Sequence, residues 1–214
     1  MKKIPRSSIS GLYAITPDEP DTAELLRKVR CALRGGARIV QYRNKLAGTA
    51  LRLNQAAELR GLTHEFAATF IVNDDAQLAA RVDADGVHLG GGDGSIVATR
   101  ALLGANKLIG VSCYNRLDLA RQAAREGSNY VAFGAFFASA VKPNAPVASL
   151  ELLREARSQL SLPVVAIGGI TLQNGAQLLA AGASALAVIS AVFSAPDIEQ
   201  TARRFSALAD SLII

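Results

Sequence analysis

Short apolar segments alternate with longer segments of helical periodicity along the whole chain. The apolar segments are rich in β-branched residues, which is typical of strands buried on both faces. We predict eight strands, at residues 12–15, 39–42, 70–72, 86–89, 108–112, 130–133, 164–167 and 185–189. The segments between them, such as 22–34 and 117–126, are rich in Ala, Leu, Arg, Glu and Gln and favour helices.

This alternation predicts βα units and a parallel sheet. Small residues at 35–37, 83–86, 127–128 and 181–183 each end a predicted helix and lead into a strand, as a short αβ loop requires. Eight such units in 214 residues favour a (β/α)8 TIM barrel over a doubly wound sheet, which more often has five or six strands. We therefore expect one barrel domain over residues 1–214.

Composition and charge favour a soluble protein with small anionic ligands. The formal net charge is +5, but no run of positive residues is longer than Lys2 and Lys3, so we expect neither nucleic-acid nor membrane binding. Cys31 and Cys113 have no disulfide or zinc spacing. No signal-peptide or membrane-spanning pattern is present, which favours a cytoplasmic protein. The oligomeric state stays open, a homo-oligomer included.

Two carboxylates follow successive predicted strands. The third strand runs into Asn73 and Asp74, and the fourth passes His88 and reaches Asp93 after a glycine-rich turn. Because parallel neighbours end at the same rim, Asp74 and Asp93 should lie together, where α/β folds bind ligands. Carboxylates combined with substrate phosphate oxygens are typical ligands of Mg²⁺.

Other strand ends supply donors for an anion. Gln41, Arg43 and Lys45 lie at the end of the second strand and suit a diphosphate if they alternate outward; an ordinary solvated loop is the alternative. Ser112 ends the fifth strand with a hydroxyl. The sixth strand leads into a long loop that resembles a lid, whose best ligand contacts are Ser139 and Lys142.

The last two strands carry a phosphate-binding pattern. The seventh ends in Gly168 and Gly169, and the eighth ends in Ile189 and Ser190 before a short helical turn. In TIM barrels these two loops commonly bind phosphate through backbone N–H groups, although a glycine pair can also be a simple tight turn. His88 is either a residue of the mouth or a structural histidine, and His64 is expected on the surface.

The ordered set of strand-end motifs resembles the thiamine phosphate synthase family over nearly the whole chain. The motifs are Q-x-R-x-K at 41–45, N-D at 73–74, A-D-G-V-H-L-G-x-x-D at 84–93, G-V-S at 110–112, the lysine at 142, and A-I-G-G-I at 166–170. The resemblance implies an alkyl transferase that joins 4-amino-2-methyl-5-pyrimidinylmethyl diphosphate to a thiazole phosphate. Thiamine phosphate and diphosphate would be the products, with Mg²⁺ as cofactor.

The resemblance also implies residue roles. The pyrimidine diphosphate would be bound by Gln41, Arg43, Lys45, Asn73 and Lys142. Asp74 and Asp93 would hold Mg²⁺, and Ser112 and Ser139 would bind phosphates or the thiazole. The thiazole phosphate would be held by the Gly168 and Gly169 loop and by the backbone of Ile189 and Ser190.

The residues indicate dissociative loss of diphosphate, because cations are present and no Cys-His or Ser-His-Asp arrangement is. Arg43, Lys45, Ser112 and Lys142 would be the catalytic residues. Departures from the family pattern at Gly91 and Val141, where glutamine and threonine are usual, bear on affinity more than on reaction type. The alternatives are a thiazole tautomerase and a non-catalytic thiazole phosphate-binding protein.

Overall fold

The strands form a closed barrel. The computed structural model describes residues 9–91, 94–137 and 147–211. Its strands are β1 (Gly11–Ile15), β2 (Ile39–Tyr42), β3 (Thr69–Asn73), β4 (Gly86–Leu89), β5 (Leu108–Tyr114), β6 (Tyr130–Phe133), β7 (Val164–Ile167) and β8 (Ala185–Val188). Neighbours pair in parallel in chain order, and β8 pairs with β1. The prediction of a (β/α)8 barrel is confirmed.

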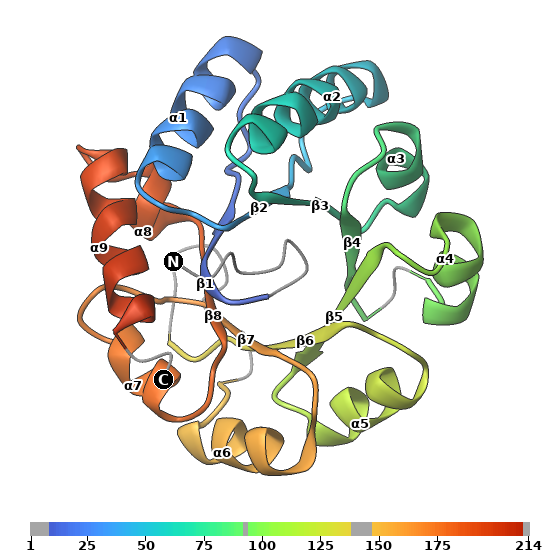
Figure 1. Cartoon of the computed structure of the whole chain (residues 1–214), viewed down its shortest axis with the longest axis vertical. Coiled ribbons are helices and arrows are strands. Elements are labelled where there is room, and N and C mark those ends of the chain that lie inside the picture. Colours follow the sequence, from blue (N-terminus) through green and yellow to red (C-terminus); the bar gives the residue numbers. More distant parts are fainter. Residues whose placement is uncertain (1–8, 92–93, 138–146, 212–214) are drawn as a thin grey trace.

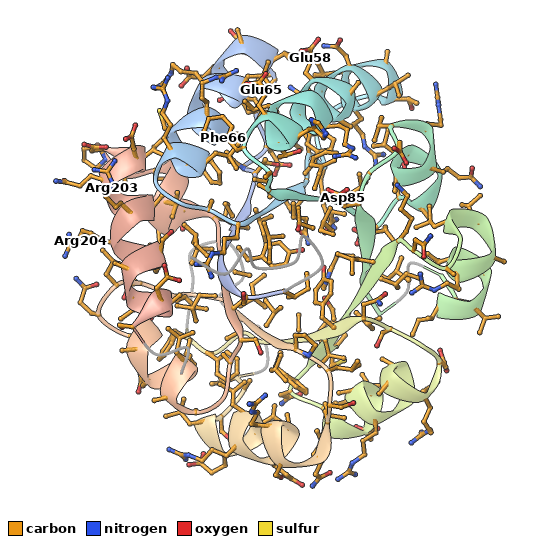
Figure 2. All side chains as sticks on the ribbon, viewed as in Figure 1. Glu58, Glu65, Phe66, Asp85, Arg203 and Arg204 are labelled. Carbon is orange, nitrogen blue, oxygen red and sulfur yellow. The ribbon has the colours of Figure 1, made fainter. Side chains whose placement is uncertain are left out.

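Helices surround the barrel in chain order (Figure 1). They are α1 (Thr22–Arg34), α2 (Thr49–Glu65), α3 (Ala76–Arg81), α4 (Ile96–Leu103), α5 (Leu117–Arg125), α6 (Leu150–Gln159), α7 (Gly175–Ala180), the short α8 (Ser190–Phe193) and α9 (Ile198–Asp210). Five begin at a side chain that accepts a backbone N–H, which satisfies a donor the helix itself leaves open: Asp21, Asp75, Ser95, Ser149 and Asp197. Glu58 of α2 and Arg203 and Arg204 of α9 project outward from this ring (Figure 2).

Four predicted strands differ from the structure at their ends. β1 begins at Gly11, one residue earlier than predicted. β3 is longer by one residue at each end, and β5 continues to Tyr114 through a register shift between Ser112 and Tyr114. β8 ends at Val188, because Ile189 leaves the extended conformation (φ −115°, ψ −87°) to start α8. All four differences lie where strands meet loops, because the apolar pattern of a sequence defines the middle of a strand better than its ends.

The alternation of side chains along each strand creates two cores. Outward residues such as Val40 and Val87 pack with the helices in one cluster. Inward residues form a second cluster inside the barrel, including Ile39, Ile71 and Val165. The parallel direction brings the carboxyl ends of all eight strands to one rim, the rim that carries the active site in TIM barrels. None of the helices described here is both long and apolar enough to cross a membrane.

Candidate active site

A polar pocket of about 280 Å³ opens between the ends of β2 and β3. We call it the cation pocket; its lining residues are Tyr42, Arg43, Asn44, Lys45, Ala47, Arg52, Asn73 and Asp74. Lys45 Nζ lies 3.5 Å from Asp74 Oδ2, and the Lys45 side chain is 59% exposed. An exposed pair of this kind is held weakly, so both charges are accessible to an anion or a cation from solution.

The loop after β1 holds Arg43 and Lys45 in place. Asp18 Oδ2 pairs with the Arg43 guanidinium at 3.0 Å, and Asp18 Oδ1 accepts the Lys45 backbone N–H at 2.6 Å. The buried Thr16 hydroxyl bonds to both the N–H and the carbonyl of Arg43, each at 2.9 Å. Sequence reasoning missed this support, because Asp18 lies in a polar loop and matches no motif.

A second set of bonds fixes the base of the pocket. The buried Gln55 of α2 accepts from the Tyr42 hydroxyl at 2.9 Å and from Asn44 Nδ2 at 3.1 Å. Both Asn44 and Gln55 donate to the Glu19 carbonyl. The side chains of Tyr42 and Asn44 are thus engaged by the scaffold. Arg52 is a further pocket cation that the motifs did not indicate, and it pairs with Asp75 at 2.9 Å.

The consecutive acidic residues after β3 have different tasks. Asp74 takes a left-handed backbone (φ 62°), which Asp tolerates better than most residues, and its N–H donates to the His88 carbonyl at 2.8 Å. Asp75 instead caps α3 and pairs with Arg52. Asp74 is therefore the one of the two carboxylates that lines the pocket. Asp93 lies outside the described residues.

Gln41 and Ser112 lie away from the cation pocket. Gln41 points into the barrel, is 3% exposed, and donates from Nε2 to the Tyr13 hydroxyl at 2.7 Å. Ser112 lines a second pocket of about 540 Å³ beside β4 and β5, and its Oγ lies 2.9 Å from His88 Nε2. Of the three residues predicted at the end of β2, Arg43 and Lys45 line the cation pocket, whereas Gln41 belongs to the strand itself and lies deeper.

Gly91 and Tyr114 form one wall of the second pocket. The Tyr114 hydroxyl accepts the Gly91 N–H at 3.1 Å. A Cβ at position 91 would lie 2.8 Å from that hydroxyl, so a larger residue there would displace Tyr114. Tyr114 therefore occupies the space that a side chain at position 91 would need.

The ends of β7 and β8 form adjacent backbone-rich turns. Gly168 and Gly169 have φ of 99° and 64°, and a Cβ on Gly168 would lie 2.4 Å from the Ala135 Cβ. Asn174 braces the turn by donating to the Gly169 carbonyl at 3.0 Å and accepting from the Thr171 N–H at 2.8 Å. After β8, Ile189 is half-buried and Ser190 is exposed at the start of α8, which has no side-chain cap.

Two other predicted site residues, Ser139 and Lys142, lie outside the described residues. Within the described ranges, no group of three or more His, Cys, Asp or Glu side chains is arranged to hold a metal ion. His88 faces the barrel interior and is 8% exposed, and His64 is exposed at the end of α2.

Known proteins resemble this chain over nearly its whole length. Residues 12–192 match the family model described as thiamine monophosphate synthase. The chain is 56% identical over 200 residues to the thiamine-phosphate synthase of Methylobacillus flagellatus, covering 94% of this chain and 95% of that protein. It is 50% identical over 208 residues to that of Aromatoleum aromaticum, covering 97% and 100%.

A solved structure supports the same assignment. The thiamine phosphate pyrophosphorylase from Pyrococcus furiosus superimposes with a TM-score of 0.87 at 36% identity, covering 98% of this chain and 99% of that one. Both the sequence relatives and this structure span nearly the whole chain. The chain belongs to the thiamine monophosphate synthase family.

Proposed function

We propose that the chain joins 4-amino-2-methyl-5-pyrimidinylmethyl diphosphate to 4-methyl-5-(2-phosphooxyethyl)thiazole by dissociative loss of diphosphate at the barrel rim. The condensation that forms thiamine phosphate follows from membership of the family. The mechanism and the residue roles are our proposal. The observation that carries it is the cation pocket, where Arg43, Lys45, Asn73 and Asp74 line one space.

The cation pocket is the proposed diphosphate site. Arg43 offers a planar fork of donors that matches phosphate oxygens, and Lys45 offers a mobile point charge. Asn73 adds a neutral amide on the β3 side of the same pocket. Ser139 and Lys142 belong to the proposal on sequence grounds alone, as the residues that the family pattern places over the substrate.

Mg²⁺ is the proposed cofactor. Asp74 suits it, because its carboxylate is partly exposed in the pocket and pairs with only one cation among the described residues, at 3.5 Å. Asp93 is the second proposed ligand, and substrate phosphate oxygens would complete the set. When bound, Mg²⁺ would supply positive charge beside the leaving diphosphate.

The turns after β7 and β8 are the proposed site of the thiazole phosphate. Glycine at 168 and 169 would let the backbone approach a phosphate closely, and Ile189 and Ser190 stand at the start of α8, where a helix leaves its first N–H groups without a partner in the helix. β8 is paired with β1, whose loop holds Arg43, so the two phosphate sites lie on one rim. The pyrimidine methylene carbon and the thiazole nitrogen, the two atoms that react, would then lie between the two phosphate sites.

The reaction then needs one bond to break and one to form. The bond between the pyrimidine methylene carbon and the diphosphate oxygen breaks, and its electron pair leaves with the diphosphate. Arg43 and Lys45 would neutralise the charge that develops there. The thiazole nitrogen, held by its own phosphate, donates its lone pair to the methylene carbon, so positioning replaces a dedicated protein base.

Replacing the carboxylates tests this site. Asp74→Ala and Asp93→Ala should each lower kcat about 100-fold or more, because the leaving group loses stabilisation, while affinity for the thiazole phosphate stays within about twofold. Turnover with a Mg²⁺ titration and calorimetric binding of the thiazole phosphate measure the two effects.

The control is the neighbouring carboxylate. Asp75→Asn keeps an N-cap on α3 and weakens only the pair with Arg52, so its Mg²⁺ dependence should match that of the unmodified chain. Unaltered Mg²⁺ dependence in both alanine variants would contradict the metal assignment.

The cytoplasmic location is likewise a proposal, supported by free thiols at Cys31 and Cys113.

A further inference from the structure

Five polar side chains form a continuous hydrogen-bonded chain across the barrel interior. Gln41 Nε2 lies 2.7 Å from the Tyr13 hydroxyl, which lies 2.9 Å from the Tyr130 hydroxyl. Tyr130 lies 3.1 Å from His88 Nδ1, and His88 Nε2 lies 2.9 Å from Ser112 Oγ. We call these residues the interior relay. They come from β2, β1, β6, β4 and β5, and they link two residues of the proposed site.

The two tyrosines of the relay are fully enclosed. Tyr13 and Tyr130 are 1% and 0% exposed, and their rings meet edge to face with centroids 6.2 Å apart. Gly110 makes the space for Tyr130, since a Cβ there would lie 2.0 Å from Cζ of the ring. A hydroxyl enclosed in this way must place its single hydrogen on one of its neighbours, because an unsatisfied buried donor is costly.

The direction of the hydrogen bonds follows from the chemistry of the first member. Gln41 Nε2 only donates, so the Tyr13 oxygen accepts from it. Among the described residues the Tyr13 hydroxyl meets only Gln41 and Tyr130, so its hydrogen goes to Tyr130. Burial raises the pKa of both tyrosines, which keeps both hydrogens in place.

The two remaining hydrogen bonds, from Tyr130 to His88 and from His88 to Ser112, have the same direction. Tyr130 accepts from Tyr13 and therefore donates its hydrogen to His88 Nδ1. A neutral His88 then carries its proton on Nε2 and donates to Ser112 Oγ, so the Ser112 hydrogen is directed away from His88. Reversal of the Gln41 amide would reverse every bond in the relay.

We propose that the interior relay sets the hydrogen-bonding polarity of the active-site mouth, with Tyr13, Tyr130 and His88 as positioning residues. On the β2 wall, Gln41 keeps Oε1 as an acceptor, and on the β5 wall, Ser112 keeps a hydrogen to donate. An aminopyrimidine offers the complement, an exocyclic amine that donates and ring nitrogens that accept. This substrate preference rests on the proposed function, whereas the polarity of the relay does not.

The tautomer of His88 reports the polarity directly. The chain has two histidines, so ¹⁵N-labelled imidazole spectra of the His64→Gln variant show His88 alone. We expect Nε2 to be protonated and Nδ1 to be unprotonated in the ligand-free protein. Protonation of Nδ1 with a bare Nε2 would overturn the proposed direction, whether or not the enzyme turns over.

Reversing the hydrogen bond between Gln41 and Tyr13 tests whether it is coupled to the tautomer of His88. Gln41→Glu replaces the amide donor by a carboxylate, which only accepts when ionised, so at pH 8 Tyr13 must donate to it and each later bond must reverse. We expect the His88 proton to move to Nδ1. Adding Tyr13→Phe should abolish that move. A His88 tautomer that is the same in Gln41→Glu and in the unmodified chain would overturn the coupling.

Steady-state kinetics test the positioning role. Tyr130→Phe should let both His88 tautomers exchange and raise KM for the pyrimidine diphosphate about tenfold, while KM for the thiazole phosphate stays unchanged. Thr63→Val is the matched control, because it removes a buried hydroxyl whose partners among the described residues are the Leu59 and Arg60 carbonyls of α2. Equal KM values in Tyr130→Phe and the control would overturn the positioning role, and Tyr13→Phe serves if Tyr130→Phe does not fold.

Discussion

At the scale of single residues, the proposed diphosphate site depends on a side chain that no motif indicates. Asp18 binds the guanidinium of Arg43 and the backbone N–H of Lys45 at once, from a different βα unit. Its charge opposes that of the cations, yet its two bonds hold the loop after β2 against the barrel. We infer that Asp18 favours diphosphate binding more by positioning the two cations than it opposes binding by cancelling part of their positive charge. Its side chain is only 28% exposed and lies 3.0 Å from the Arg43 guanidinium.

Removing Asp18 should therefore weaken binding of the pyrimidine diphosphate. Asp18→Ala is expected to raise its KM about tenfold and to lower the free energy of unfolding by about 1–2 kcal/mol. Asp18→Asn should restore part of both losses, because Oδ1 still accepts the Lys45 N–H. Kinetics and urea unfolding measure the two effects.

The control for Asp18 lies at the other end of β2. Arg38 directly precedes β2, at the end of the strand opposite to the rim, and it pairs with Asp210 at 2.7 Å. Asp210→Ala should leave both KM values unchanged. A lower KM in Asp18→Ala would show instead that the negative charge dominates, and the inferred role would be wrong.

At the scale of elements, the turn after β7 is shaped by close backbone contact. Phe137 N–H donates to the Gly168 carbonyl at 3.1 Å, so the turn is tied to the chain that follows β6. The positive φ of Gly168 and the nearby Ala135 leave no room for a side chain. Because the proposed phosphate site consists of backbone groups, its geometry depends on these contacts.

Gly168→Ala should weaken binding of the thiazole phosphate more than it destabilises the fold. We expect KM for the thiazole phosphate to rise about tenfold or more, with a loss of about 1–3 kcal/mol in the free energy of unfolding from strain. KM for the pyrimidine diphosphate should change far less. Binding calorimetry with each substrate alone measures the difference.

Gly61→Ala provides the matched substitution in a helix. Position 61 lies in α2 with nothing within 4 Å of an added Cβ, so alanine should raise stability by about 0.5–1 kcal/mol without altering either KM. If Gly168→Ala bound the thiazole phosphate normally, the phosphate would have to be held elsewhere on the rim.

At the scale of the whole molecule, the barrel keeps several titratable groups in their neutral form. Burial raises the pKa of Tyr42 to about 12, and raises that of Tyr13 and Tyr130 still further. Burial also raises the pKa of the Cys113 thiol to about 12. These groups ionise readily only when the barrel opens, so alkaline pH acts on global stability.

Stability should fall as pH rises above about 10. There the unfolded tyrosines lose their protons while the folded ones keep them, so the unfolded state binds fewer protons and is favoured by rising pH. Each such tyrosine contributes about 1.4 kcal/mol per pH unit between its unfolded and folded pKa. Tyrosinate absorbance and far-UV circular dichroism should change together in this range.

Tyr42→Phe tests the account, because it removes one of these groups. The slope of unfolding free energy against pH should decrease by about 1.4 kcal/mol per pH unit between pH 10 and 12. Full tyrosinate absorbance at pH 11 with an intact circular dichroism spectrum would contradict it.

The sequence by itself determined the barrel and part of the set of residues at its rim. Residues 39–42, 86–89, 130–133 and 164–167 coincide with β2, β4, β6 and β7, because a buried parallel strand needs a continuous apolar run, a local property of the chain. Strand ends are equally local, so Arg43, Asn73 and Asp74 could be assigned to the mouth from spacing alone. The family resemblance, carried by those strand ends, is confirmed.

The tertiary structure decided which strand-end residues meet and what holds them. Asp18 reaches Arg43, and Gln41 reaches Ser112 through Tyr13, Tyr130 and His88, across elements that are distant in the chain. No periodicity encodes such contacts, because they depend on the stagger of the strands and on spaces such as the one that Gly110 leaves for Tyr130. The tyrosines matched an apolar strand pattern, and only closure of the barrel brought their hydroxyl groups together.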